Sequence, residues 1–127
     1  MSFKINKIHH IKLTVRNLGI SKRFYESLPG FKRVADYPDF IMFSAGNFYL
    51  GLTGQNGRIP KDSFSEFNIG LDHFSFEVQS KQDLESALEF FDKNKIIHGE
   101  IEKLSNNLLI LAFRDPDNIQ LELCCKE

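Results

Sequence analysis

His10-Ile-Lys-Leu-Thr-Val15, written HIKLTV, decides how the 127-residue chain is organised, because a second stretch repeats its pattern. His73-Phe-Ser-Phe-Glu-Val78, written HFSFEV, also places apolar residues at the first, third and fifth positions after a histidine. This alternation is typical of a β-strand with two unlike faces. The two copies therefore predict an internal duplication in which each half begins with an equivalent strand.

A helix is expected after each of these strands. Asn17 precedes apolar residues at helical spacing, and Ser80 with Asp83 forms a capping pattern in the second half. Three strand-like runs follow each helix: residues 31–34, 40–43 and 48–53, then 96–101, 108–113 and 119–124. The sequence thus predicts an α+β fold of two tandem βαβββ modules in a single domain, residues 1–127. Module one spans about 7–54, a polar linker about 55–68, and module two about 69–125.

The two faces of these strands carry different residues, because successive side chains point to opposite sides. One face is apolar and is expected to pack against the helices. The other is polar or small and includes His10, Lys12, Thr14, Tyr49, Gly51, His73, Ser75, Gln120 and Glu122. A sheet that turns such a face away from its helices either meets water or curves around a cavity. Two histidines with a glutamate favour a cavity, which the other six residues would line.

The last strands of the two halves align Leu50-Gly51-Leu52 with Leu121-Glu122-Leu123. Fewer residues separate His10 from His73 than separate these two strands, so this register depends on matching the apolar faces. Gly51 then stands where Glu122 stands in the second half. We expect the missing side chain to leave open space there.

His10, His73 and Glu122 are candidate metal ligands. Imidazole and carboxylate together suit divalent iron, manganese, nickel, zinc or cobalt, and three ligands leave positions open for substrate. Taken singly, a strand histidine is more often a hydrogen-bonded structural residue, and a strand glutamate usually faces solvent. His9 is the rival of His10, but alternation places it on the helix-facing side. His98 is either a base outside the ligand set or an ordinary turn or surface histidine.

Composition excludes several other classes. The 16 Lys and Arg against 17 Asp and Glu give a net charge of −1 without a run of like charges, so no nucleic-acid partner is expected. No apolar stretch approaches the roughly 20 residues of a membrane span, and the N-terminus lacks a signal-peptide core. Cys124 and Cys125 are adjacent, so a bond between them would be strained. We expect free thiols and a cytoplasmic protein.

Four stretches in this order resemble the vicinal oxygen chelate superfamily, which includes glyoxalase I, extradiol dioxygenases, fosfomycin-resistance proteins and bleomycin-binding proteins. They are HHIKLTV (9–15), FYESLPGF (24–31), GLDHFSFEV (70–78) and FRDPDNIQLEL (113–123). The resemblance implies paired modules that form a curved mixed sheet around a divalent metal, with the helices outside. It also implies His10, His73 and Glu122 as the ligands. A homodimer whose modules combine across chains is common in this superfamily.

Gly51 departs from the glyoxalase I pattern, which usually has a fourth ligand, a carboxylate, at that position. The remaining three ligands resemble those of extradiol dioxygenases and fosfomycin-resistance enzymes, although the further features of those enzymes are not evident here. We expect a metal-dependent dioxygenase or a lyase or isomerase acting on a small molecule, with no catalytic residue assigned beyond the metal ligands. The alternatives are a metal-free small-molecule-binding protein of the bleomycin-resistance type and a structural or regulatory module.

Overall fold

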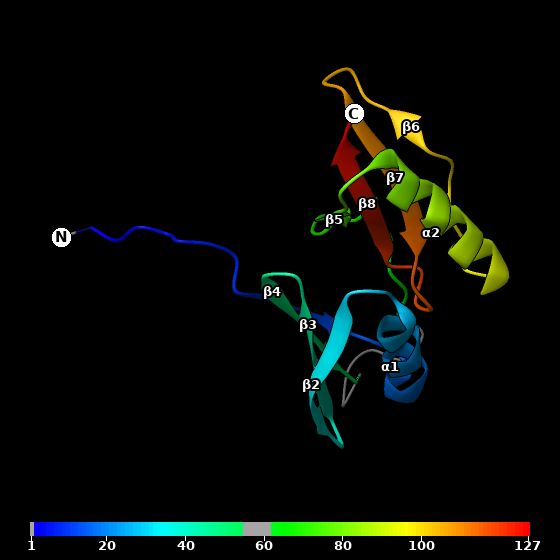
Figure 1. Cartoon of the computed structure of the whole chain (residues 1–127). Coiled ribbons are helices and arrows are strands. Elements are labelled where there is room, and N and C mark those ends of the chain that lie inside the picture. Colours follow the sequence, from blue (N-terminus) through cyan, green and yellow to red (C-terminus); the bar gives the residue numbers. More distant parts are fainter. Residues whose placement is uncertain (1, 55–61) are drawn as a thin grey trace. The chain divides into compact units, whose positions relative to one another are not determined.

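The computed structural model describes residues 2–54 and 62–127, which form two compact units, Met1–Lys61 and Asp62–Glu127. The first unit contains β1 (His10–Thr14), α1 (Leu18–Ser27), β2 (Phe31–Tyr37), β3 (Phe40–Ala45) and β4 (Phe48–Thr53). The second contains β5 (Phe74–Glu77), α2 (Lys81–Lys93), β6 (Glu102–Lys103), β7 (Leu108–Arg114) and β8 (Gln120–Lys126). Each unit is thus a βαβββ module (Figure 1), and the predicted α+β fold is confirmed.

The predicted linker falls in two parts. Residues 55–61 lie outside the described residues, whereas residues 62–68 belong to the second unit. Within the described ranges, no helix is long and apolar enough to cross a membrane.

The two units share one sheet topology. Their strand orders are β1-β4-β3-β2 and β5-β8-β7-β6, and in each the first and last strands of the module pair in parallel. Lys12 pairs with Gly51, and Ser75 pairs with Glu122. Lys12 and Ser75 occupy equivalent positions after the two repeated histidines, so the alignment of Gly51 with Glu122 is confirmed.

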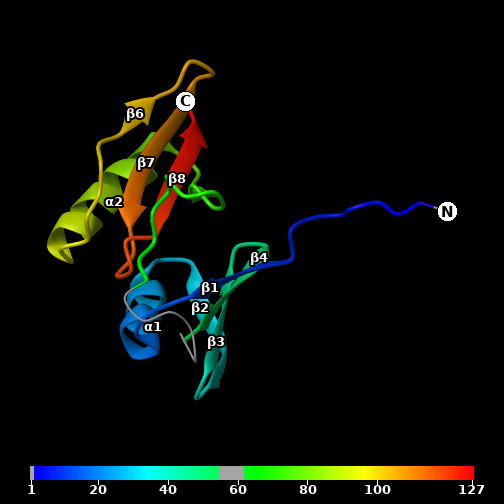
Figure 2. The same ribbon diagram turned by 180° about the vertical axis from the view of Figure 1, so that it is seen from behind.

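Each helix covers one face of its own sheet (Figure 2). The Asn17 side chain caps α1 by accepting a hydrogen bond from the Ile20 N–H at 2.9 Å. Asp83 caps α2 by accepting from the Ser80 N–H at 3.3 Å, so both predicted caps are present. The strand residues facing the helices form the cores, which include Leu13, Val15, Leu50, Leu52, Phe74 and Leu121. The predicted alternation of the strand faces is therefore correct.

The strand predicted at residues 96–101 is the exception. His98 makes an isolated bridge to Phe113, and regular pairing begins only at β6, where Glu102 faces Ile110. Four residue steps on this segment therefore oppose three on β7, which is the extra residue of a β-bulge. The bulge interrupts the ladder and leaves β6 only two residues long.

His98 joins this bulged segment to α2. Its Nδ1 lies 2.6 Å from the Gly99 carbonyl oxygen, and its Nε2 lies 2.6 Å from Asp92 Oδ1. Both partners are acceptors, so both ring nitrogens donate only when the ring is an imidazolium. The hydrogen bonds to Gly99 and Asp92 raise the pKa of His98. No ring nitrogen remains for metal or proton chemistry, so His98 is a structural residue.

We expect His98→Gln to destabilise the protein more at pH 5.5 than at pH 9. A histidine pKa raised by folding gives stability that is fully present below the unfolded value near 6.5 and is lost as pH rises through the folded value. At pH 5.5 the variant should have a free energy of unfolding about 1 kcal/mol below that of the wild type. The loss is small because Asp92 is largely exposed, which weakens its interaction with His98. Urea unfolding at both pH values measures it. Asp92→Asn should reduce the same pH dependence, and an equal loss at both pH values would contradict a charged His98.

Candidate functional site

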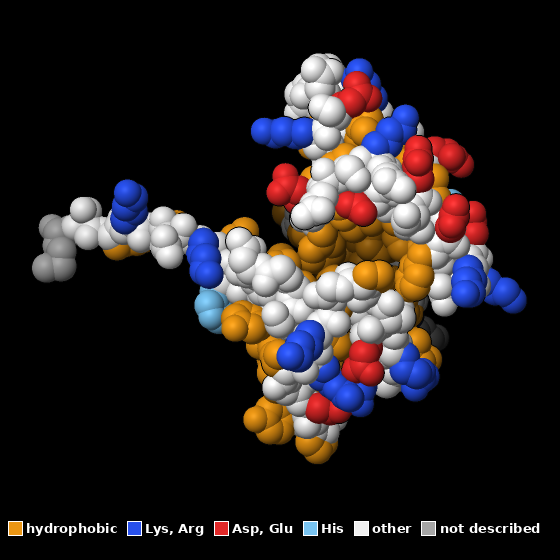
Figure 3. Space-filling view, viewed as in Figure 1, with side chains coloured by type: hydrophobic (Ala, Val, Ile, Leu, Met, Phe, Trp, Pro, Cys, Tyr) orange, Lys and Arg blue, Asp and Glu red, His pale blue; other side chains and the backbone are white. Residues whose placement is uncertain are grey.

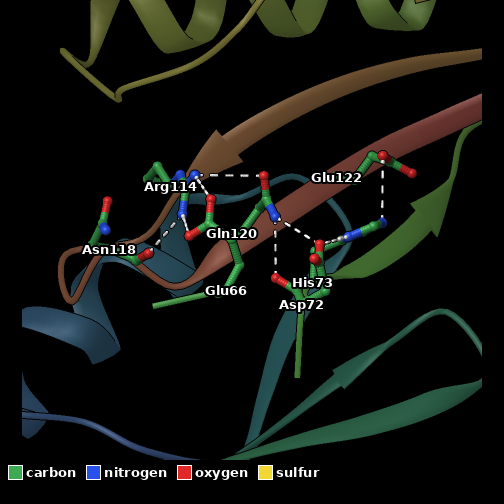
Figure 4. Close-up of polar contacts among 7 residues, drawn as sticks. All are labelled: Glu66, Asp72, His73, Arg114, Asn118, Gln120 and Glu122. Carbon is green, nitrogen blue, oxygen red and sulfur yellow. Dashed lines mark hydrogen bonds and ion pairs between the residues drawn. The ribbon is translucent and has the colours of Figure 1, made fainter. Parts of the chain in front are cut away.

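His73 and Glu122 meet on the polar face of the second unit (Figure 4). His73 immediately precedes β5, and Glu122 lies within β8 opposite Ser75. His73 Nε2 is 3.6 Å from Glu122 Oε2, and Glu122 is only 9% exposed. Two of the three predicted ligands are therefore brought together.

Asp72 fixes the tautomer of His73. Its Oδ1 lies 2.7 Å from His73 Nδ1, and a carboxylate can only accept, so Nδ1 carries the hydrogen. In neutral His73, Nε2 then presents a lone pair toward Glu122. A histidine that donates its other nitrogen to a carboxylate is the usual arrangement around protein-bound metals.

Gln120 holds Asp72 from the neighbouring strand. The side-chain amide of Gln120, at the start of β8, donates to the Asp72 backbone oxygen at 3.1 Å and to Asp72 Oδ1 at 3.0 Å. Gln120 was predicted to line a cavity, and the structure shows it bound to the residue beside His73. The Gln120 side chain thus holds Asp72, which in turn holds His73.

Arg114, at the end of β7, forms the far end of this network. Its two terminal nitrogens bind the two carboxylate oxygens of Glu66 at 2.6 and 3.0 Å, and one of them lies 3.5 Å from Gln120 Oε1. The Arg114 guanidinium lowers the pKa of Glu66 to about 2, chiefly by hydrogen bonding. Glu66 therefore stays ionised at physiological pH.

A tight turn places the start of β8. Asp115 is buried, and its Oδ1 accepts from the N–H groups of Asp117 and Ile119 at 2.8 and 2.9 Å. Asn118 has a φ of 66°, a left-handed conformation that asparagine tolerates well. The DPDN sequence therefore fixes where β8 begins, and with it the positions of Gln120 and Glu122.

Sequence reasoning missed the roles of Asp72, Glu66 and Arg114. Asp72 stands beside a predicted ligand in GLDHF, and Arg114 stands in the FRDPDN stretch, so both had a local signal. Glu66 had none, since it lies in the predicted linker, far from Arg114 along the chain.

The third predicted ligand, His10, belongs to the first unit. His10 is exposed and pairs with Tyr49 across the parallel ladder. Lys12 and Thr14 follow it on the same exposed face, so alternation along β1 is as predicted.

His9 does not follow that alternation. Regular strand structure begins only at His10, and the His9 ring packs against Tyr49 with centroids 5.3 Å apart. His9 Nδ1 also lies 3.0 Å from His10 Nδ1. The prediction that His9 turns to the helix-facing side is therefore wrong, because the residue precedes the strand that would impose the alternation.

Gly51 does not leave open space. A Cβ atom built there would lie 3.0 Å from the Phe40 ring and 3.5 Å from Lys12 Cγ. Lys12 Nζ in turn stands 4.8 Å from the centre of the Phe40 ring, a cation–π contact. The predicted space beside Gly51 is thus filled by Phe40, and alignment with Glu122 gave no indication of that ring.

The three candidate ligands belong to different units of the chain. In the part of the chain that the structure describes, no cluster of three or more His, Cys, Asp or Glu side chains is close enough to hold a metal. The second unit supplies the close pair, His73 and Glu122, while His10 lies in the first.

We expect Gly51→Ala to destabilise the protein by about 1 kcal/mol. Replacing a strand glycine recovers about 0.5–1 kcal/mol, but overpacking against a ring costs about 1–3 kcal/mol. In a Phe40→Leu background the same change should be neutral or stabilising, because the ring is gone. Urea unfolding of the four proteins in this double-mutant cycle measures the coupling. The same cost in both backgrounds would show that Phe40 does not fill the space.

Comparison with known proteins agrees with this architecture. A domain of the glyoxylase/bleomycin resistance protein/dioxygenase type from Frankia sp. EAN1pec is 33% identical, with a TM-score of 0.87 over 98% of this chain and 94% of that chain. YqjT, an uncharacterized protein of Bacillus subtilis strain 168, is 23% identical over 91% of this chain and 96% of its own length. Lactoylglutathione lyase from Agrobacterium tumefaciens shares the fold, at 20% identity and a TM-score of 0.76 over 95% of this chain and 94% of that chain.

The family pattern itself extends over nearly the whole sequence. It matches residues 7–123, which include the first βαβββ module, the second up to the middle of β8, and all three candidate ligands. The chain belongs to the Glyoxalase/Bleomycin resistance protein/Dioxygenase superfamily.

Proposed function

We propose that the protein is a metal-dependent enzyme of this superfamily, in which His73, Glu122 and His10 hold a divalent ion that binds oxygen atoms of a small substrate. The observation that carries the proposal is the orientation of His73. Its Nδ1 donates to Asp72, so its Nε2 faces the Glu122 carboxylate at 3.6 Å. In the neutral ring, Nε2 and the carboxylate are two acceptors directed at each other, and a metal cation bound between them would satisfy both.

The donor set fits such an ion. Imidazole nitrogen and carboxylate oxygen bind zinc at about 2.0–2.2 Å, and two donors at tetrahedral positions around it would be roughly 3.4 Å apart. The observed 3.6 Å is close to that value. Iron, manganese, nickel and cobalt accept the same donors, so the set does not select one of them.

His10 would complete the set from the first unit, of the same chain or of a second copy. The hydrogen bond between the Nδ1 atoms of His9 and His10 leaves His10 Nε2 available as the ligand atom. Both imidazoles are neutral as ligands, and Glu122 supplies one negative charge. A divalent ion in this set retains a formal charge of +1, which favours an anionic or polarised substrate oxygen.

The metal would supply Lewis acidity, which stabilises negative charge as it develops on substrate oxygen. The chain's own residues would bind and orient the substrate. Lys12, Thr14 and Tyr49 in the first unit and Ser75 in the second are exposed on the same faces as the candidate ligands. Gly51, which lies beneath the Phe40 ring, supplies no fourth carboxylate. This donor set is compatible with a dioxygenase and with a lyase or isomerase.

We expect His10→Ala, His73→Ala and Glu122→Gln each to weaken divalent metal binding at least 100-fold. Each change removes one of only three protein ligands. The measurement is titration calorimetry with Zn²⁺ and Mn²⁺ on protein purified without a metal-affinity tag. His9→Ala is the matched control and should change the affinity less than tenfold, since it removes contacts with His10 and Tyr49 but no metal ligand.

Two results would contradict this assignment. Equal losses in His9→Ala and His10→Ala would make His9 as important as His10. A wild-type protein that binds no divalent metal would exclude the metalloenzyme and favour a metal-free small-molecule-binding protein.

We propose further that the protein is a homodimer. Each sheet has two outer strands, β1 and β2 in one and β5 and β6 in the other, and such edges are available for pairing. The N-terminal segment before β1 also exposes Phe3, Ile5 and Ile8. Figure 3 shows apolar and basic side chains along this segment. An exposed apolar segment next to an edge strand favours association of two copies.

Light scattering at micromolar concentration should therefore give twice the chain mass of 14.7 kDa. Replacing Phe3 and Ile5 together with serine should shift the population toward the monomer, because it removes apolar surface from the segment. A wild-type mass equal to that of a single chain would exclude the dimer.

A further inference from the structure

We propose that Gln120 and Arg114 are positioning residues for His73, and that docking of the 62–68 segment through Glu66 sets the ring orientation of this ligand. The three side chains and Asp72 form a continuous chain of polar contacts that ends at His73 (Figure 4). We call this chain the Glu66–His73 relay. The inference rests on the proposed function, in which His73 binds the metal.

The hydrogen-bonding groups on either side of Gln120 fix the orientation of its side-chain amide. Arg114 has only donors, so the oxygen of the Gln120 amide must face it, at 3.5 Å. The amide nitrogen then faces Asp72, which offers only acceptors. With the amide turned the other way, its nitrogen would face the donors of Arg114 and its oxygen would face the oxygens of Asp72. The Gln120 amide therefore has one favourable orientation.

Gln120 restrains Asp72 twice, through its backbone oxygen and through Oδ1. The backbone contact fixes the peptide that leads into His73, and the side-chain contact fixes the carboxylate that binds His73 Nδ1. The Asp72 side chain is 67% exposed, so without Gln120 it would be free to turn into solvent.

The Arg114–Glu66 end of the relay is more buried than the His73 end. Arg114 and Glu66 have side chains only 21% and 16% exposed, with two parallel contacts between them. Arg114 also donates to the Asn118 carbonyl oxygen at 3.1 Å, which ties it to the turn before β8. The position of the 62–68 segment is thereby coupled to the orientation of His73.

The variants used to measure Zn²⁺ affinity keep the charge, because any change of charge near a cation alters its affinity by itself. Gln120→Met keeps the volume and removes both hydrogen bonds to Asp72. Arg114→Lys keeps the positive charge and removes the planar fork that contacts Glu66, Asn118 and Gln120 together. Gln82→Met on α2 and Arg33→Lys in the ion pairs of the first unit are the matched controls.

Two readouts are needed. The first is the tautomer of His73 in the metal-free protein at pH 8.5, read from the ¹⁵N chemical shifts of the ring. The wild type should be mostly Nδ1–H, and Gln120→Met and Arg114→Lys should shift it toward Nε2–H. The second is Zn²⁺ affinity by competition with a chelator, which should fall about tenfold in both variants. The two controls should change neither.

Glu66→Gln tests the part assigned to the segment. It should shift the His73 tautomer in the wild-type background and leave it unchanged in a Gln120→Met background, because the relay is already broken there. Equal shifts in both backgrounds would overturn the role of Glu66.

An unchanged tautomer and unchanged Zn²⁺ affinity in folded Gln120→Met protein would overturn the relay as a whole. Failure of the proposed function looks different. Wild-type protein that binds no Zn²⁺ would exclude the metal site, while the tautomer measurement would still decide whether the relay orients His73.

Discussion

The parallel pairing of the first and last strands of each module is the constraint on which the rest of the structure depends. It places Lys12 beside Gly51 in one unit and Ser75 beside Glu122 in the other. Side chains alternate along a strand, so a slip of one residue would exchange the apolar face with the polar face. Burial of Leu50 and Leu121 under the helices excludes that slip. The position of Glu122 next to His73 follows from this register.

The two modules use one topology for different purposes. Where the second module has Glu122 beside His73, the first has Gly51 covered by Phe40. In the proposed site, a second carboxylate at the position of Gly51 would add a second negative charge to the ligand set and would cancel the charge of the divalent ion. The protein has a carboxylate at position 122 only. At position 51 it has a glycine covered by the Phe40 ring, which also contacts Lys12. This asymmetry is what distinguishes the proposed three-ligand site from a four-ligand one.

Sequence patterns predicted the features that depend on local alternation. The strand faces and the two helix caps were predicted because each is set by residues a few positions apart, and the duplication was predicted because the same short pattern occurs in both halves. The strand at residues 96–101 was not predicted correctly, since the pairing of this segment is reduced to the His98–Phe113 bridge and depends on the register against the distant strand β7. Phe40 over Gly51 and Glu66 on Arg114 were also missed, because each depends on where a distant side chain points. The His9 prediction failed because alternation was extended beyond the strand end.

The Glu66–His73 relay contributes little to the fold but a useful amount to a binding site. A partly exposed ion pair is worth about 0–1 kcal/mol, whereas one buried leucine such as Leu111 contributes about 1.5–3 kcal/mol. Sheet stability therefore does not require the relay. Immobilising a side chain on binding costs about 0.5–1.5 kcal/mol, and a contact network formed during folding removes that cost in advance. Since about 1.4 kcal/mol corresponds to a factor of ten, orienting His73 alone would raise the affinity by at most roughly tenfold.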